Sequence, residues 1–222
     1  MENLIIYWNT IKGLWGVSVS PILAALSLML GILNSLILIT QWVKDKPKLV
    51  VNPIHPNVYQ WYYTLPDGEY EGKKTKRYGF LCYVGIANKG LRDVSLSEFR
   101  LLVANKFHKE HMLYSVNIPQ PEIPLGFGHV KILSVLGQKS LVTEGDTHII
   151  SGGSISGMAF YIYEYYGDDG WDLKVKDSTI TAYFRIQDVF GKTAKRKIKF
   201  SEKPLEHLQE VLPGFDLSTY QN

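Results

Sequence analysis

Residues 21–43, PILAALSLMLGILNSLILITQWV, are the stretch around which the chain is organised. They include no Asp, Glu, Lys, Arg or His over 23 residues, and Lys44, Asp45 and Lys46 follow directly. At about 1.5 Å per residue, a helix of this length spans about 34 Å, and the hydrocarbon core of a bilayer is about 30 Å thick. The stretch therefore predicts a transmembrane helix.

A cleaved signal peptide is the main alternative for this segment. Its apolar run is longer than an ordinary signal-peptide core, and no small-x-small cleavage motif follows it. Instead, Trp42 precedes Lys44, Lys46 and Lys48, the aromatic-and-cation pattern of a span held at a membrane interface. We therefore predict an uncleaved, single-pass anchor with these four residues at the interface.

The first twenty residues have apolar side chains near a helical period, including Trp8 and Trp15. We predict that residues 1–20 form an amphipathic helix in the plane of the headgroups, with a disordered tail as the alternative. Lysines crowd the C-terminal side of the span, so the positive-inside rule favours a cytoplasmic C-terminal domain. A periplasmic or extracellular domain is the alternative.

Small and polar residues share one face of the predicted span. Ser27, Gly31 and Ser35 recur every four residues, Ala24 extends the same stripe, and Asn34 lies beside it. Small side chains let another helix approach closely, and Asn or Ser can hydrogen-bond across the contact. The stripe predicts a membrane-protein partner or self-association; the alternative is that this face meets lipid.

Length and composition limit the number of domains, the class of partner and the cellular compartment. After the span 179 residues remain, the size of one ordinary domain. The net charge is +3, well short of a dedicated nucleic-acid binder, so no nucleic acid is expected. Cys82 is the single cysteine and no Asn-x-Ser/Thr sequon is present, which fits a cytoplasmic or bacterial domain.

After a linker at residues 44–56, the pattern predicts β-structure almost throughout. In one alternating strand, Phe80, Cys82, Val84 and Ile86 share a face. Residues 117–129, rich in Pro and Gly, predict a crossing loop. Short strands with no helical pattern between them predict an antiparallel β-sandwich at residues 57–203, and residues 204–222 predict a short helix and tail. The expected strands cover residues 57–64, 76–87, 94–103, 111–118, 130–136, 155–163, 179–187 and 194–200, with another at 48–52.

Two motifs carry a resemblance to a known family. IANKG followed by VSLSEFRLLV, and the later hairpin ITAYFRIQDVFGK with KIKF, resemble the immunoglobulin-like sandwiches of bacterial single-pass membrane-anchored proteins. The resemblance covers about residues 76–200. It departs from the family pattern in that Cys82 has no partner cysteine and no central Trp follows at the usual position. It implies a fold class and no particular activity.

The segment YIYEYYGDDGWD, residues 161–172, is the densest candidate for a binding surface. Tyrosine and tryptophan offer large contact areas at low entropic cost, as in many binding loops. In the alternative, Tyr161 and Tyr163 pack the core and the acidic turn is ordinary. Calcium is not expected, because the spacing fits no twelve-residue calcium loop. The proposed protein-binding residues are Tyr163, Tyr165, Tyr166, Asp168, Asp169 and Trp171.

Catalytic and metal-binding patterns are weak. His108 and His111 lack further ligands for zinc, and no nucleophile elbow or phosphate-binding loop is present. We therefore expect no cofactor, no metal and no enzyme activity. The sequence predicts a non-catalytic accessory or scaffolding subunit that binds protein through its span and its β-domain. An extracytoplasmic adhesion or ligand-sensing module using loop 161–172 is the alternative, and an unfamiliar membrane-tethered hydrolase is the third possibility.

Overall fold

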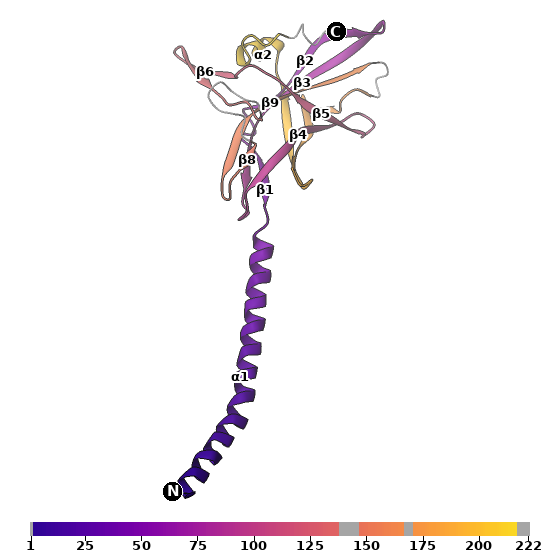
Figure 1. Ribbon diagram of the computed structural model, residues 1–222. Helices are drawn as coiled ribbons and strands as arrows, with labels where there is room; N and C mark the ends of the chain where they lie inside the picture. Colours follow the sequence, from indigo (N-terminus) through magenta and orange to yellow (C-terminus); the bar gives the residue numbers. More distant parts are fainter. Residues whose placement is uncertain (1, 138–146, 167–170, 217–222) are drawn as a thin grey trace. The chain divides into compact units, whose positions relative to one another are not determined.

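The computed structural model describes residues 2–137, 147–166 and 171–216, with backbone only for residues 2–20, 44, 70 and 126. The chain forms two compact units, Met1–Lys46 and Pro47–Asn222 (Figure 1).

The first unit is the helix α1, Glu2–Lys44 (Figure 1). It runs without interruption through both the predicted interfacial segment and the predicted span, with Pro21 inside it. Residues Pro21–Val43 are long and apolar enough to cross a membrane, and none of that stretch is buried by the rest of the chain. A membrane anchor and an N-terminal signal sequence both have these properties.

The second unit is built from strands and ends in a short helix, so the mainly β class with helices at both ends is confirmed. The expected strands, allowing for shifts at their ends, are recovered, and the C-terminal helix α2 spans Leu205–Val211. The strands are β1 Leu49–Pro53, β2 Gln60–Tyr70, β3 Lys73–Asn88, β4 Val94–Ala104, β5 Glu110–Val116, β6 Glu122–Gly126, β7 His129–Ile132, β8 His148–Ile149, β9 Ser154–Tyr166, β10 Val175–Lys176, β11 Thr179–Asp188 and β12 Thr193–Glu202.

Within the described residues, seven strands close into a barrel. Their order is β11–β12–β2–β3–β9–β5–β4, and β4 pairs back with β11 from Leu96↔Asp188 to Val103↔Ala182. The pair β12–β2 is parallel, through Ser201↔Trp61 and Glu202↔Tyr62, and the other pairs of the ring are antiparallel. A sandwich has two sheets with open edges, whereas here the β4–β11 and β12–β2 pairs join the sheet to itself. The predicted antiparallel sandwich and the immunoglobulin-like resemblance are therefore wrong.

The barrel interior is filled with side chains. β11 alternates strictly between buried and partly exposed positions, as expected for a strand with one inward face. Phe80, Cys82, Val84 and Ile86 all belong to the inner core, as the alternation predicted. The Phe80 and Phe200 rings meet edge to face at 5.3 Å, so aromatic packing across strands occupies the barrel centre.

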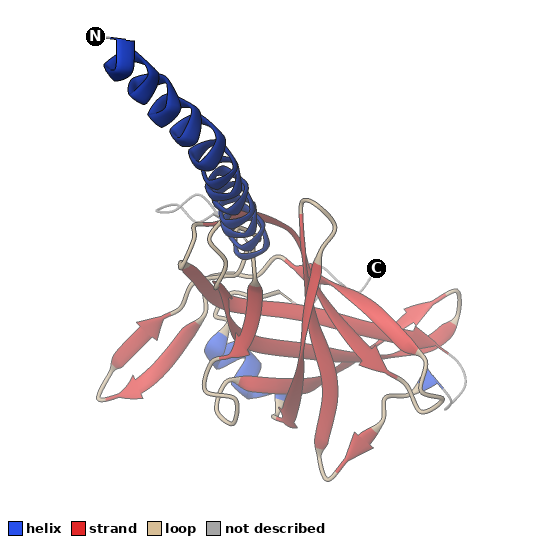
Figure 2. Ribbon diagram, turned by 90° about the horizontal axis from the view of Figure 1, so that it is seen from below, coloured by secondary structure: helices blue, strands red, loops and turns tan. Residues whose placement is uncertain are grey.

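A second core lies on the outer face of β2, β3 and β9. Trp61, Tyr63 and Phe160 face outward there and are covered by Leu208 of α2 and by residues around Ile123. The His207 ring of α2 lies 4.5 Å from the Trp61 ring, and Tyr63 Oη and His207 Nδ1 are 3.0 Å apart. Both faces of these central strands are thus buried. Hairpin β6–β7 forms a separate two-stranded sheet beside them (Figure 2).

Candidate functional site

The residues of the predicted small-residue face lie on one side of α1. At 100° per residue, its five predicted members fall within an arc of about 100°. Ser27 Oγ donates to the Ala24 carbonyl at 2.9 Å, and Ser35 Oγ donates to the Gly31 carbonyl at 2.8 Å. Both hydroxyls are therefore satisfied within the helix, which lowers their cost in an apolar environment. The predicted members are Ala24, Ser27, Gly31, Asn34 and Ser35.

A groove runs along this face. Its lining consists of small residues together with larger aliphatic ones: Ala24, Ser27, Leu28, Gly31, Ile32, Ser35 and Leu36. A Cβ placed on Gly31 would meet no atom within 4 Å, so the space in front of this residue is open. Asn34 is exposed, and among the described residues its side-chain amide has no hydrogen-bond partner. In hydrocarbon such an amide favours a partner helix that can supply one.

The predicted interface residues fall in two places. Trp42 is exposed, and Lys46 Nζ lies 3.9 Å above its ring, a cation–π contact. Lys48 belongs to the barrel unit and is exposed. The structure places Trp8, Trp15 and Lys44 on α1 and describes only their backbone.

The described residues of the predicted binding segment are divided between the interior and the surface. Tyr163 and Tyr165 are 3% and 6% exposed and belong to the barrel core together with Tyr161. Their alternation along β9 does place them on one face, but that face is the interior. Tyr166 and Trp171 are exposed, while Asp168 and Asp169 lie outside the described residues. Tyr163 and Tyr165 must therefore be removed from the expected surface.

Asp172 fastens the end of this segment to the barrel. It accepts hydrogen bonds from Tyr78 Oη at 2.8 Å and from Lys106 Nζ at 3.2 Å. Tyr163 Oη donates to the Trp171 carbonyl at 2.7 Å, and burial raises the pKa of Tyr163 to about 12. Burial alone would raise the pKa of the Asp172 carboxyl, but the hydrogen bonds from Tyr78 and Lys106 outweigh it and hold that pKa below its ordinary value. The arrangement positions the loop rather than exposing a reactive group.

These contacts give a pH prediction. A carboxyl whose folded-state pKa lies below its unfolded value stabilises the fold fully above the unfolded pKa and loses that contribution as the pH falls through the folded one. We expect Asp172→Asn to cost about 1 kcal/mol of unfolding free energy at pH 7. The difference from the unsubstituted chain should shrink as the pH drops below about 4. Urea titrations of both chains at several pH values measure it; a difference independent of pH would contradict an ionised Asp172.

Hairpin β6–β7 is an interaction feature that the sequence interpretation missed. Gly126 pairs with His129, which leaves Phe127 and Gly128 as a two-residue turn with φ of 52° and 78°. Ile123 and Leu133 at its base are buried in the outer core. Beyond them the apolar side chains are exposed: Leu125, Phe127, Val130 and Ile132. The alternation of Ile123, Leu125 and Phe127 before Gly128 was the available signal, hidden within the proline-rich segment predicted to be a loop.

His108, His111 and Cys82, which were weighed as possible functional residues, lie apart from any metal-binding cluster in the described residues. His108 Nε2 lies 3.0 Å from Lys174 Nζ, and His111 Nε2 lies 3.3 Å from Asn105 Nδ2. Within the described part of the chain, no three His, Cys, Asp or Glu side chains gather at one point. Cys82 is fully buried, and burial raises the pKa of its thiol, so the thiol is unreactive in the folded barrel.

No known protein family and no curated protein matches this chain. Several solved structures are similar at a low level, including the following two. The structural-genomics target SoR45 is 9% identical, covering 79% of this chain and 93% of its own, with a TM-score of 0.30. A Bordetella pertussis protein described as ApaA is 9% identical, covering 70% of this chain and 93% of its own, with a TM-score of 0.26. The barrel is defined by the pairing of its own strands.

Proposed function

We propose that the chain is a single-pass membrane protein that assembles with other membrane proteins and carries its barrel as a protein-binding module. The observation that carries this proposal is the face of α1 that combines an open groove at Gly31 with the exposed amide of Asn34. Small residues allow close approach of a second helix, and an Asn amide in hydrocarbon rewards a partner that hydrogen-bonds to it. In this role the chain is a non-catalytic accessory or scaffolding subunit.

The barrel offers a second contact. Hairpin β6–β7 exposes Leu125, Phe127, Val130 and Ile132 on a short two-stranded sheet that is fixed to the outer core at its base. Exposed apolar and aromatic side chains clustered on a rigid element are typical of protein-interaction surfaces. This hairpin replaces Tyr163 and Tyr165 as the preferred binding element of the domain.

Gly31→Leu tests the assembly. We expect the substitution to fill the groove and to weaken association by about 1–2 kcal/mol, a roughly five- to thirtyfold loss of co-purifying partner. A Cβ at Gly31 meets nothing within 4 Å, so the leucine side chain starts in open space. Met29→Leu, on another face of α1, is the matched control. The measurement is the mass and composition of the tagged chain purified in mild detergent.

The outcomes are distinct. Stoichiometric companions, or a second copy, that are retained by Met29→Leu and lost by Gly31→Leu support assembly through this face. A monomer in all preparations contradicts it. Intact-mass measurement of the chain isolated from whole cells tests the anchor itself, because loss of the N-terminal residues through the apolar stretch would identify a cleaved signal sequence.

Orientation separates the cytoplasmic placement from the extracytoplasmic alternative. Lys44, Lys46 and Lys48 beside the span support a cytoplasmic barrel. Since Cys82 is buried, a surface cysteine is needed as the reporter, and exposed Phe107 in the loop between β4 and β5 is a suitable position. In intact cells Phe107→Cys should resist a membrane-impermeant maleimide. Labelling in intact cells would place the barrel outside and favour an adhesion or sensing module.

A further inference from the structure

One end of the barrel brings together the start of β1 and three loops. We call it the Lys48 end, and it consists of Lys48, residues 88–93, residues 150–153 and residues 188–192. Asn88, only 1% exposed, ties most of it together. Its Oδ1 accepts hydrogen bonds from the Lys48 and Gly90 amides, at 3.2 and 3.0 Å, and its Nδ2 donates to the Arg92 carbonyl at 2.7 Å. The backbone of these loops is therefore held in place.

Apolar side chains stand out from this fixed backbone. Each of the three loops exposes at least one: Leu91, Ile150, Val189 and Phe190. In the last loop Asp188 Oδ1 accepts hydrogen bonds from the amides of Phe190 and Lys192, at 2.9 and 2.8 Å. This turn presents Phe190, which is 79% exposed. Three separate loops thus carry apolar tips at one end of the barrel.

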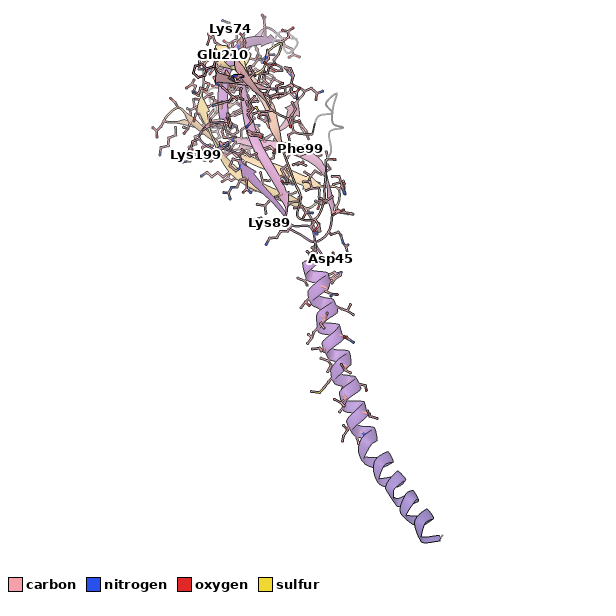
Figure 3. All side chains as sticks on the ribbon, turned by 90° about the vertical axis from the view of Figure 1, so that its left-hand side faces the viewer. Asp45, Lys74, Lys89, Phe99, Lys199 and Glu210 are labelled. Carbon is pink, nitrogen blue, oxygen red and sulfur yellow. The ribbon has the colours of Figure 1, made fainter. Side chains whose placement is uncertain are left out.

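Cations surround these tips. Lys48, Lys89, Arg92 and Lys192 are all exposed at the Lys48 end. Of the neighbouring carboxylates, Asp188 is buried in its turn, and Asp93 Oδ1 accepts a hydrogen bond from the Ser151 amide at 2.7 Å. The surface is therefore net positive. Figure 3 labels Lys89 at this end of the barrel and Lys74 at the opposite end.

The covalent connection limits how far this end lies from the predicted span. Val43 and Lys48 are five residues apart in the sequence, so the chain between them covers at most about 17 Å. If residues 21–43 cross a bilayer, Lys48 therefore lies within this reach of the last residue of the span. Isolated apolar tips that protrude between cations match a headgroup layer, where apolar groups insert about 5–10 Å and cations meet anionic lipid.

We propose that the Lys48 end docks on an anionic lipid surface, with Leu91, Ile150 and Phe190 inserted among the headgroups. This inference rests on the proposed membrane anchoring. Docking fixes the orientation of the barrel on the bilayer and keeps hairpin β6–β7 available for protein. The four exposed cations, set against the carboxylates of Asp93 and Asp188 (4 − 2), leave this end with a net charge of +2. Each cation near an anionic surface strengthens binding about fivefold.

Site-directed fluorescence on the full chain in lipid nanodiscs tests the docking. Cys82, the one cysteine, is buried, so an introduced surface cysteine takes an environment-sensitive nitrobenzoxadiazole label selectively. Phe190→Cys reports the Lys48 end. Phe107→Cys is the matched control, because Phe107 is also an exposed loop phenylalanine near lysines and follows β4 at its other end. The 11 residues of β4 separate the two ends by about 35 Å.

The expected result is a blue-shifted emission at position 190, with quenching by acyl-chain nitroxide lipids at least about twofold stronger than at position 107. The effect should grow when phosphatidylglycerol replaces part of the phosphatidylcholine. Lys89→Gln in the Phe190→Cys chain should lower the docking constant about fivefold on anionic nanodiscs, and Lys109→Gln at the other end should leave it unchanged.

Equal, water-like emission at both positions in chains that co-elute with nanodiscs would overturn docking and leave the anchor intact. A chain that never enters nanodiscs would instead contradict the proposed anchoring. A blue shift at position 190 without quenching by lipid nitroxides would indicate a protein contact and would overturn docking on lipid.

Discussion

Phe184→Ala is expected to lower the free energy of unfolding of the barrel by about 3–5 kcal/mol, because it leaves a cavity in the packed interior. Phe184 is fully buried on β11, and its ring lies 6.3 Å from that of Tyr161 across the barrel core. Its register partner on β4 is Leu101. The cavity would therefore open beside the β4–β11 pair that closes the ring.

Phe190→Ala is the matched control for this substitution. Phe190 follows the same strand but is largely exposed, so its loss should change stability by less than about 0.5 kcal/mol. Urea titrations in detergent, read by the labelling rate of the Cys82 thiol, measure both, since Cys82 reacts only when the barrel opens. Similar effects of the two substitutions would contradict the assigned interior.

Local pattern was enough to predict the strands of the barrel. Alternation in residues 76–87 correctly placed Phe80, Cys82, Val84 and Ile86 on one face, and the structure shows that this face is buried. The closure of the sheet into a barrel could not be predicted from local pattern. A strand that faces a core alternates identically in a sandwich and in a barrel, and what differs is which distant segments pair. The contacts of β4 with β11 and of β12 with β2 join segments far apart in the sequence and leave no local signal.

The candidate sites also divide into features that local sequence predicts and features that depend on the tertiary structure. The small-residue face of α1 depends only on helical spacing, so the sequence predicts it directly, and its role in helix packing stays a prediction. Tyr163 and Tyr165 were predicted to lie on a binding surface, but tyrosines suit a binding loop and a barrel core equally well, and both lie in the core. The Lys48 end depends on Asn88 joining loops that precede β4 and β9, and such a hub is visible only in three dimensions.

Gly157→Ala is expected to destabilise the barrel by about 3 kcal/mol, through steric overlap and two lost backbone hydrogen bonds. A Cβ at Gly157 would lie 2.6 Å from the Leu136 backbone nitrogen and 2.9 Å from its Cα. Backbone cannot rotate away as a side chain can, so residues 134–136 would have to leave β9. The two backbone hydrogen bonds that would be lost run from the Leu136 amide to the Met158 carbonyl and from the Met158 amide to the Ser134 carbonyl, each 2.8 Å long.

Gly85→Ala on β3 separates this steric effect from the general cost of changing a strand glycine. A Cβ at Gly85 would meet the Ile54 side chain at 3.4 Å, an ordinary contact, so the substitution should be neutral or slightly stabilising. Hydrogen exchange localises the difference: Gly157→Ala should strip protection from the Leu136 and Met158 amides first, and Gly85→Ala should leave both protected. Equal tolerance of alanine at both glycines would contradict the close packing of residues 134–136 against Gly157 on β9.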